Sequence, residues 1–223
     1  MINGSNGNFI SAVASADIKA AKQLAADRSG NIYVLYLGNS NSNNCYLAKH
    51  NSKGAKLYSK LINTATPPAV GVVPPPSMSL DDEGNAYVHH GKSLSRIDPA
   101  GVIKWKLDLG TDEDVKIVTN KLGDTYLANG SGKYVYPTTR LAKISKFGKL
   151  LYNKPLFDYT SHMDQPGYKY VRIAGLHMFD TIGLIVTGDF AGKVNFDPQG
   201  EEGILTGNFN TNLVPDIFAA EGE

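Results

Sequence analysis

A short unit that recurs along the chain limits its fold more than any other feature. Aspartate or asparagine is followed three residues later by glycine, and an aromatic residue comes three residues after that. The copies are Asp27, Gly30, Asn31, Tyr33; Asp81, Gly84, Asn85, Tyr87; Asn120, Gly123, Asp124, Tyr126; and a degenerate Asp180, Gly183, Leu184, Val186. The acidic or amide side chain can accept a backbone hydrogen bond two residues on, and glycine tolerates a positive φ. Because β-type residues flank the unit, it predicts a β-hairpin.

A second unit alternates with the first. It reads Leu-Ala-Lys, then glycine, then an aromatic residue, in the copies Leu47–Lys49, Gly54, Tyr58; Leu94–Arg96, Gly101, Trp105; and Leu141–Lys143, Gly148, Tyr152. The three glycines are spaced 47 residues apart. Two hairpins per repeat make four short strands, and a period in the forties is typical of β-propeller blades.

The two ends of the chain complement each other in this pattern. Residues Asn8 to Ala14 have the character of a last strand without its earlier strands, and Asp216 to Ala219 form an apolar third strand after which the chain ends. The sequence therefore predicts one all-β domain over residues 1–223, a β-propeller of about four blades of four antiparallel strands. The ring is closed by pairing of the N-terminal strand with the C-terminal blade. The blades are expected at about 18–62, 76–109, 114–157, and 170–218 with 8–14. A linear stack of the same units and a part of a larger ring are the alternatives.

The fourth repeat resembles a known family. The segment Gly188 to Pro198, followed by Leu205-Thr206 and Asp216-Ile217-Phe218, is similar to the bacterial β-propeller repeat family called SBBP. The chain departs from that pattern at Leu184 and Ala220. The resemblance implies extracellular or surface-associated binding and scaffolding, with no shared catalytic residues.

Charge and composition exclude several classes of protein. The formal net charge is +1, so the chain lacks the basic field that non-specific nucleic-acid binding uses, and no nucleic-acid partner is expected. A single cysteine, Cys45, excludes an internal disulfide. No apolar run is long enough for membrane insertion, and no signal peptide is visible.

The different lengths of the connections between hairpins point to one face as the binding surface. The turns within hairpins are short and uniform, whereas the connections between hairpins differ widely in length, and in a propeller these connections lie on one face. Five residues of these connections are the candidate binding residues: Tyr134, Tyr136, Tyr159, His162 and Tyr168. Aromatic side chains are favoured in binding hot spots and sugar contacts. The alternative is that these tyrosines pack within the fold.

The sequence contains no recognisable motif for catalysis or metal binding. His89 and His90 are neighbours on an expected strand, so they point to opposite faces and cannot bind one metal together. The acidic stretch Asp112 to Asp114 does not have the spacing of a calcium loop. Gly130 to Lys133 lacks the earlier glycine of a phosphate loop, and Cys45 has no identifiable base. We therefore expect no catalytic residue, no metal site and no cofactor.

Three functions fit these observations. The first is a non-enzymatic structural or protein-interaction module in a cell-surface, extracellular or virion assembly. The second is a carbohydrate-binding propeller that holds a surface glycan on its tyrosine-rich face. The third is a propeller hydrolase or lyase, whose polar groups would have to converge in one pocket.

Overall fold

The computed structural model describes residues 18, 20–38, 43–65, 74–110, 114–129, 139–156, 170–179, 183–191, 193–195, 204–206 and 216–222. Within these residues every regular element is a β-strand. The all-β class predicted from the sequence is therefore confirmed. No helix in this part of the chain is long and apolar enough to cross a membrane.

Three four-stranded antiparallel sheets follow one another along the chain. Sheet I consists of β1 (Ala20–Ala26), β2 (Ile32–Leu37), β3 (Asn44–His50) and β4 (Lys56–Thr64). Sheet II consists of β5 (Ser77–Leu80), β6 (Ala86–His90), β7 (Ser93–Ile97) and β8 (Ile103–Asp108). Sheet III consists of β9 (Val115–Thr119), β10 (Thr125–Asn129), β11 (Arg140–Ile144) and β12 (Leu150–Pro155). Each strand pairs with its neighbours in chain order, as two hairpins per repeat predict.

The last repeat differs from the others. Sheet IV has the order β13 (Tyr170–Phe179), β14 (Gly183–Ala191) and β17 (Asp216–Gly222), and a separate hairpin of β15 (Lys193–Asn195) and β16 (Ile204–Thr206) precedes β17. As the sequence predicts, β17 occupies the third position of its sheet. Residues 8–14, expected as its fourth strand, lie outside the described residues.

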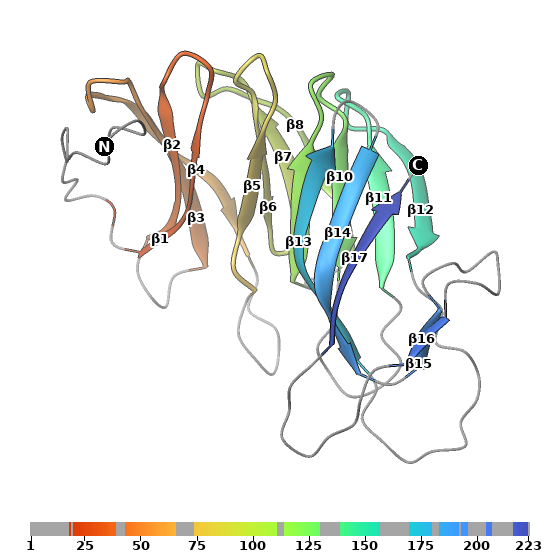
Figure 1. Cartoon of the computed structure of the whole chain (residues 1–223). Coiled ribbons are helices and arrows are strands. Elements are labelled where there is room, and N and C mark those ends of the chain that lie inside the picture. Colours follow the sequence, from red (N-terminus) through yellow and green to blue (C-terminus); the bar gives the residue numbers. More distant parts are fainter. Residues whose placement is uncertain are drawn as a thin grey trace, which may run out of the picture.

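The sheets pack face to face in chain order, with the first strands β1, β5, β9 and β13 next to one another. Figure 1 shows this array, with the hairpin turns of successive sheets along the top. We call this the hairpin end, and the opposite end, where β2 leads to β3 and β4 to β5, the loop end. We call the face that a sheet turns to the next sheet its front face, and the opposite face its rear face. Face-to-face packing of four-stranded meanders is the way propeller blades pack.

Buried apolar side chains fill each space between neighbouring sheets. Leu35 and Leu47 of sheet I meet Met78 and Val88 of sheet II. The next two spaces are filled in the same way, by Leu94, Ile117, Leu127 and Ile144, and by Tyr126, Ala128, Ile173, Leu184 and Val186. Burial of one such large side chain contributes about 1.5–3 kcal/mol. The core is thus a series of inter-sheet layers, which explains why the apolar positions recur with the repeat.

Both hairpins of a repeat close with the same turn. The Oδ1 atom of Asp27 accepts hydrogen bonds from the backbone N–H groups of Ser29 (3.0 Å) and Asn31 (2.9 Å). In the second hairpin Asn51 Oδ1 binds the N–H groups of Lys53 and Ala55 in the same pattern. The glycine three residues after each has a positive φ, 77° at Gly30 and 83° at Gly54. The recurring glycines are therefore explained by this turn.

The fourth repeat differs from the others at the position of the aromatic residue. The spacing aligns Val186 with Tyr33, Tyr87 and Tyr126, but the structure places it on the other face of its sheet. Tyr126 lies on the front face of sheet III, whereas Val186 lies on the rear face of sheet IV, in the same core layer. Because side chains alternate along a strand, the front-face position belongs to Ile185, which pairs with His177.

At one equivalent position, the rear face of sheet I is exposed where those of sheets II and III are buried. Leu24, Met78 and Ile117 stand three residues before the turn residues Asp27, Asp81 and Asn120, and each lies on the rear face of its sheet. Met78 and Ile117 are 2% and 9% exposed, because the preceding sheet covers them, whereas Leu24 is 65% exposed.

Candidate functional site

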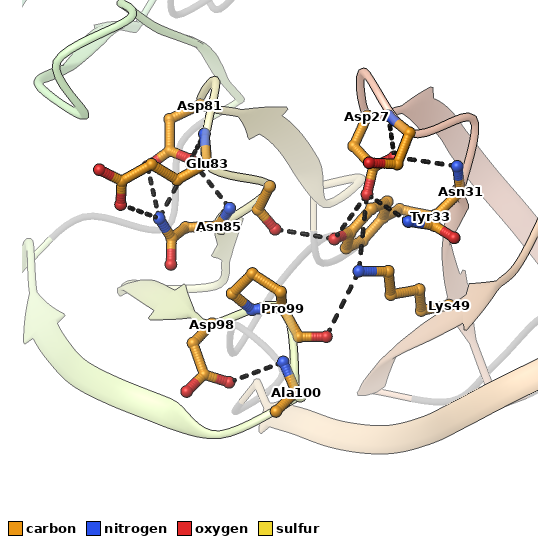
Figure 2. A network of polar contacts seen from close by, with 12 residues as sticks. Asp27, Asn31, Tyr33, Lys49, Asp81, Glu83, Asn85, Asp98, Pro99 and Ala100 are labelled. Carbon is orange, nitrogen blue, oxygen red and sulfur yellow. Dashed lines mark hydrogen bonds and ion pairs between the residues drawn. The ribbon is translucent and has the colours of Figure 1, made fainter.

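The hairpin end holds a polar network that joins sheet I to sheet II (Figure 2). The Tyr33 hydroxyl donates a 2.7 Å hydrogen bond to the carbonyl oxygen of Gly84, in the first turn of sheet II. Lys49 Nζ lies 3.5 Å from Asp27 Oδ2 and 3.4 Å from the carbonyl oxygen of Pro99, in the second turn of sheet II. Two side chains of one sheet therefore hold both turns of the next.

Aromatic side chains of sheet II contact both turns of sheet III at the following interface. Trp105 Nε1 donates a 2.8 Å hydrogen bond to the carbonyl oxygen of Lys146, in the second turn of sheet III. A Cβ added to Gly123 would lie 2.7 Å from the Tyr87 hydroxyl, and one added to Gly148 would lie 3.0 Å from the Trp105 ring. Glycine is thus favoured at these two positions for two reasons. The backbone has a positive φ, and an aromatic side chain of the preceding sheet lies too close for a Cβ atom.

The electrostatics of this network resemble those of an acid–base site. Burial alone would raise the pKa of Asp27, but hydrogen bonds from Asn31 and the charge of Lys49 outweigh it and lower that pKa. Burial raises the pKa of Tyr33 far above its usual value, and the Asp27 carboxylate adds to this effect. Each polar group is bound to a turn, and a similar lysine–aspartate ion pair recurs in sheet III between Lys143 and Asp124, 3.2 Å apart. Its repetition and its saturation with hydrogen bonds indicate a structural role.

A larger cavity lies at the loop end, between the front face of sheet II and the rear face of sheet III. Its volume is about 410 Å³, within the range of small-molecule pockets. Leu107 and Leu127 form apolar walls, and Asp108, Asn129, Arg140 and Asn153 supply polar groups. Two walls from different sheets and a few convergent polar groups are the usual composition of a binding pocket.

Arg140 is held in position at this pocket by its own sheet. Its Nε donates to Asn153 Oδ1 (2.8 Å) and its Nη2 to the Asn153 carbonyl oxygen (2.7 Å). Its backbone N–H donates to Asn129 Oδ1 (2.9 Å). The guanidinium is thus a pre-oriented cation, which suits carboxylate or hydroxyl groups of a ligand. Asp108 is oriented by the backbone N–H of Gly110 at 2.8 Å.

A smaller cavity of about 190 Å³ lies at the hairpin end, next to Asp81, Asn120 and Lys121. The carboxylate of Asp81 accepts hydrogen bonds from Glu83, Asn85 and Tyr87, so its oxygens are used within its own hairpin. Asn120 Oδ1 likewise binds two backbone N–H groups of its turn. This cavity therefore offers mainly turn-forming groups.

The remaining candidates from the sequence do not form a reactive cluster in the described part of the chain. His89 pairs across the sheet with Leu94 and His90 with Ser93, and both imidazoles are buried. Burial lowers the pKa of His89 to about 4, and burial raises the pKa of the Cys45 thiol to about 12. Asp114 forms a 3.0 Å ion pair with Lys116. No group of three or more metal-ligating side chains is found among the described residues.

The five predicted binding residues, Tyr134, Tyr136, Tyr159, His162 and Tyr168, lie outside the described residues. The structure adds Arg140, Asn129 and Asn153, which sequence reasoning missed. Asn129 and Arg140 stand at the two ends of the connection 130–138 that contains Tyr134 and Tyr136. Their position at the ends of the longest connection in that repeat was the available signal.

Comparisons with known proteins identify no family. No family model matches the chain, and no curated protein matches it. Similar solved structures include a Bacteroides caccae protein of unknown function, with a TM-score of 0.46 and 16% identity over 83% of this chain and 60% of that one. Another is regucalcin, a calcium-binding protein from Agrobacterium tumefaciens, with a TM-score of 0.44 and 13% identity over 75% of this chain and 52% of that one.

A third is the extracellular domain of a hybrid two-component system from B. thetaiotaomicron, with a TM-score of 0.37 and 11% identity over 93% of this chain and 31% of that one. This chain thus spans between about a third and three fifths of the length of these proteins. TM-scores below 0.5 assign neither a function nor a number of blades.

Proposed function

We propose that the chain is a non-enzymatic interaction module of the β-propeller type, which binds a protein partner through its loop end within a surface or virion assembly. The observation that carries this proposal is that the polar side chains have different roles at the two ends. At the hairpin end the charged and aromatic side chains are used to hold one sheet to the next. At the loop end the pocket between sheets II and III presents oriented polar groups on apolar walls.

The proposal includes the propeller itself and its SBBP resemblance. The sequence suggests a ring of four blades closed by residues 8–14, or an arc of a larger ring. The 65% exposure of Leu24, at a position that is buried in sheets II and III, favours the larger ring. We therefore propose that sheets I to IV are consecutive blades of a ring with further blades.

The pocket supports binding over catalysis. Its carboxylate, Asp108, accepts the Gly110 N–H, and its cation, Arg140, donates two hydrogen bonds to Asn153. A hydrolase or lyase would need an acid and a base that face a common substrate atom. The polar groups that the structure describes in this pocket are oriented by their own sheets, which suits recognition.

Lysine cross-linking in the native assembly tests the proposal. Lys92 and Lys154 are exposed near the loop end, and Lys53, Lys121 and Lys146 are exposed in turns of the hairpin end. We expect cross-links to the partner from Lys92 and Lys154 and none from the other three. Cross-links confined to Lys53, Lys121 and Lys146 would place the partner at the hairpin end and refute the proposal.

Carbohydrate binding is the second candidate, and the composition of the pocket favours it. Amide and guanidinium groups next to an apolar wall match the hydroxyl and carboxylate groups of an acidic sugar. Tyr134 and Tyr136 lie in the connection that begins and ends at this pocket. A glycan array that includes uronic acids tests this, and binding that Arg140→Gln abolishes would support it. An array without binding would remove the carbohydrate hypothesis and leave the protein partner.

A further inference from the structure

We propose that the pocket between sheets II and III binds a carboxylate that is joined to a large apolar group. Such a group can come from the carboxy-terminal residue of a partner chain or from a free carboxylic acid, which lacks the amide next to the carboxylate. This inference rests on the proposed role of the loop end in recognition and names the chemical group that enters its pocket. It follows from a comparison of the same position at two neighbouring sheet interfaces.

The first step is the reason why the pocket is open. At the interface between sheets I and II, a side chain of sheet I bridges to sheet II. Asn63 Nδ2 donates a 2.8 Å hydrogen bond to the carbonyl oxygen of His90, and Asn63 Oδ1 accepts one from Lys106. Gly110 stands 47 residues after Asn63 and takes its place at the next interface. It has no side chain to form the bridge, and an added Cβ would meet nothing within 4 Å.

The groups that receive this bridge in sheet II have equivalents at the pocket. Asn129 ends β10 as His90 ends β6. Asn153 stands 47 residues after Lys106, at the same place in the last strand of its sheet. Both asparagines and Gly110 line the pocket. The pocket is therefore the space that a side-chain bridge spans at the preceding interface.

The second step is the cation in this space. Arg140 pairs with Asn129 in sheet III, and the equivalent pair in sheet II is Ser93 with His90. A guanidinium thus replaces a small hydroxyl. Among the described residues no carboxylate forms an ion pair with Arg140, and its side-chain hydrogen bonds go to the neutral Asn153. A cation that is held by neutral groups gains most from an anionic ligand.

The geometry of this guanidinium favours a carboxylate. Nε and Nη2 form one edge of the planar group and both donate to Asn153. The other edge consists of Nη1 and Nη2, and two N–H groups in this fork match the two oxygens of a carboxylate. One positive charge balances one negative charge, whereas a phosphate monoester carries about −1.5 to −2 at pH 7. The carboxylate of Asp108, at the same pocket, accepts the N–H of Gly110 instead of pairing with Arg140.

The third step is the apolar part of the ligand. Six apolar residues of two sheets line the rest of the pocket: Leu107, Leu109, Val115, Leu127, Ala142 and Leu150. A branched or aromatic group buries apolar surface against such walls. A sugar would place hydroxyl groups there, and a hydroxyl that leaves water without a new hydrogen bond costs free energy. The walls therefore favour an apolar carboxylate over an acidic sugar.

Leucine-methyl NMR of the full chain tests this inference with four small probes. N-acetyl-alanyl-leucine represents a chain terminus, and isocaproate is a free apolar acid. N-acetyl-alanyl-leucinamide lacks the carboxylate, and glucuronate lacks the apolar group. The methyl signals of Leu107 and Leu127 report on the pocket. Those of Leu35 and Leu47, which are buried between sheets I and II, serve as references.

We expect at least one of the two apolar acids to shift the signals of Leu107 and Leu127 and to leave the references unchanged. The amide should bind at least about tenfold more weakly than N-acetyl-alanyl-leucine, because it leaves the guanidinium without an anion. Tighter binding of N-acetyl-alanyl-leucine than of isocaproate would assign the site to a chain terminus, and the reverse order would assign it to a free acid. No shift with either acid, equal binding of acid and amide, or binding of glucuronate alone would overturn the inference.

Two substitutions locate the site. Arg140→Gln removes the cation and should weaken the tighter acid at least about tenfold. Gly110→Asn restores the side chain that forms the bridge at the preceding interface, and asparagine tolerates a positive φ, so this variant should fold and lose binding. Lys154→Gln is the matched control, because it removes a charge next to Asn153 that lies outside the pocket, and it should bind as the parent chain does. Full affinity of a folded Arg140→Gln or Gly110→Asn variant, as judged by its urea midpoint, would contradict the inference.

Cross-linking and probe binding together separate this inference from the proposed function. Cross-links to the partner from Lys92 and Lys154, without binding of either acid, would support the partner surface and overturn only the carboxylate site. Binding of an acid, together with cross-links confined to Lys53, Lys121 and Lys146, would support the carboxylate site and refute recognition of the protein partner at the loop end.

Discussion

The hydroxyl of Tyr33 in sheet I donates a 2.7 Å hydrogen bond to the carbonyl oxygen of Gly84 in sheet II, and the tyrosine is fully buried. This bond joins two repeats together with other polar contacts, such as that of Lys49 with the Pro99 carbonyl oxygen, and with the apolar packing between the sheets. Its acceptor has been taken out of water, so loss of the donor leaves a buried carbonyl unsatisfied.

Tyr33→Phe should therefore lower the free energy of unfolding by about 1–3 kcal/mol. Tyr36→Phe is the matched control, because the Tyr36 hydroxyl forms its hydrogen bond with Ser59 Oγ of its own sheet. Urea denaturation of both variants measures the difference. A Tyr33→Phe variant as stable as the parent chain would show that this bond does not hold the sheets together.

Two effects favour glycine in these turns, the positive φ and the lack of space for a Cβ atom, and two substitutions measure them separately. Gly110 and Gly148 both have positive φ, 73° and 80°, but an added Cβ meets nothing within 4 Å at Gly110 and lies 3.0 Å from the Trp105 ring at Gly148. Gly110→Ala should cost about 1 kcal/mol, the cost of a left-handed backbone. Gly148→Ala should cost roughly 1–3 kcal/mol more, because the ring must move. Equal thermal stabilities of the two variants would argue against the close approach.

Stability should fall as the pH falls below neutral. Burial lowers the pKa of His89 to about 4 from 6.5, so the unfolded chain binds this proton more tightly than the folded one. The stabilisation is complete above pH 6.5 and is lost between pH 6.5 and about 4, by up to about 3 kcal/mol. Urea midpoints across this window check it. His89→Gln should flatten the pH dependence of the urea midpoint. His177→Gln, at an exposed position of β13, should leave that dependence unchanged. If the pH dependence persists in His89→Gln, other groups are responsible for it.

The hairpins could be predicted from the sequence because their chemistry is local. Asp27 and Gly30 determine a turn within a few residues, and the repeat of that turn reveals the four-stranded unit. The equivalent role of Asn51, Asp98 and Ser145 in the second turns was missed, because three different residue types fill one position.

The fourth repeat and the loop-end pocket were beyond such local reasoning. A shift of one residue along β14 reverses every side chain, so the spacing that aligns Val186 with the tyrosines does not determine which face it lies on. The pocket is formed by Leu107 of one repeat and Arg140 of the next. Their approach depends on how two sheets pack, which no short motif encodes.

The central claim is that the hairpin end holds the array and the loop end recognises the partner. Its most direct test is the affinity of the cross-linked partner for two charge-reversal variants, Arg140→Glu at the loop end and Lys121→Glu at the hairpin end. We predict that Arg140→Glu weakens binding at least about tenfold, or roughly 1.4 kcal/mol, and that Lys121→Glu leaves it unchanged. Weakening by Lys121→Glu together with full affinity of Arg140→Glu would contradict the account.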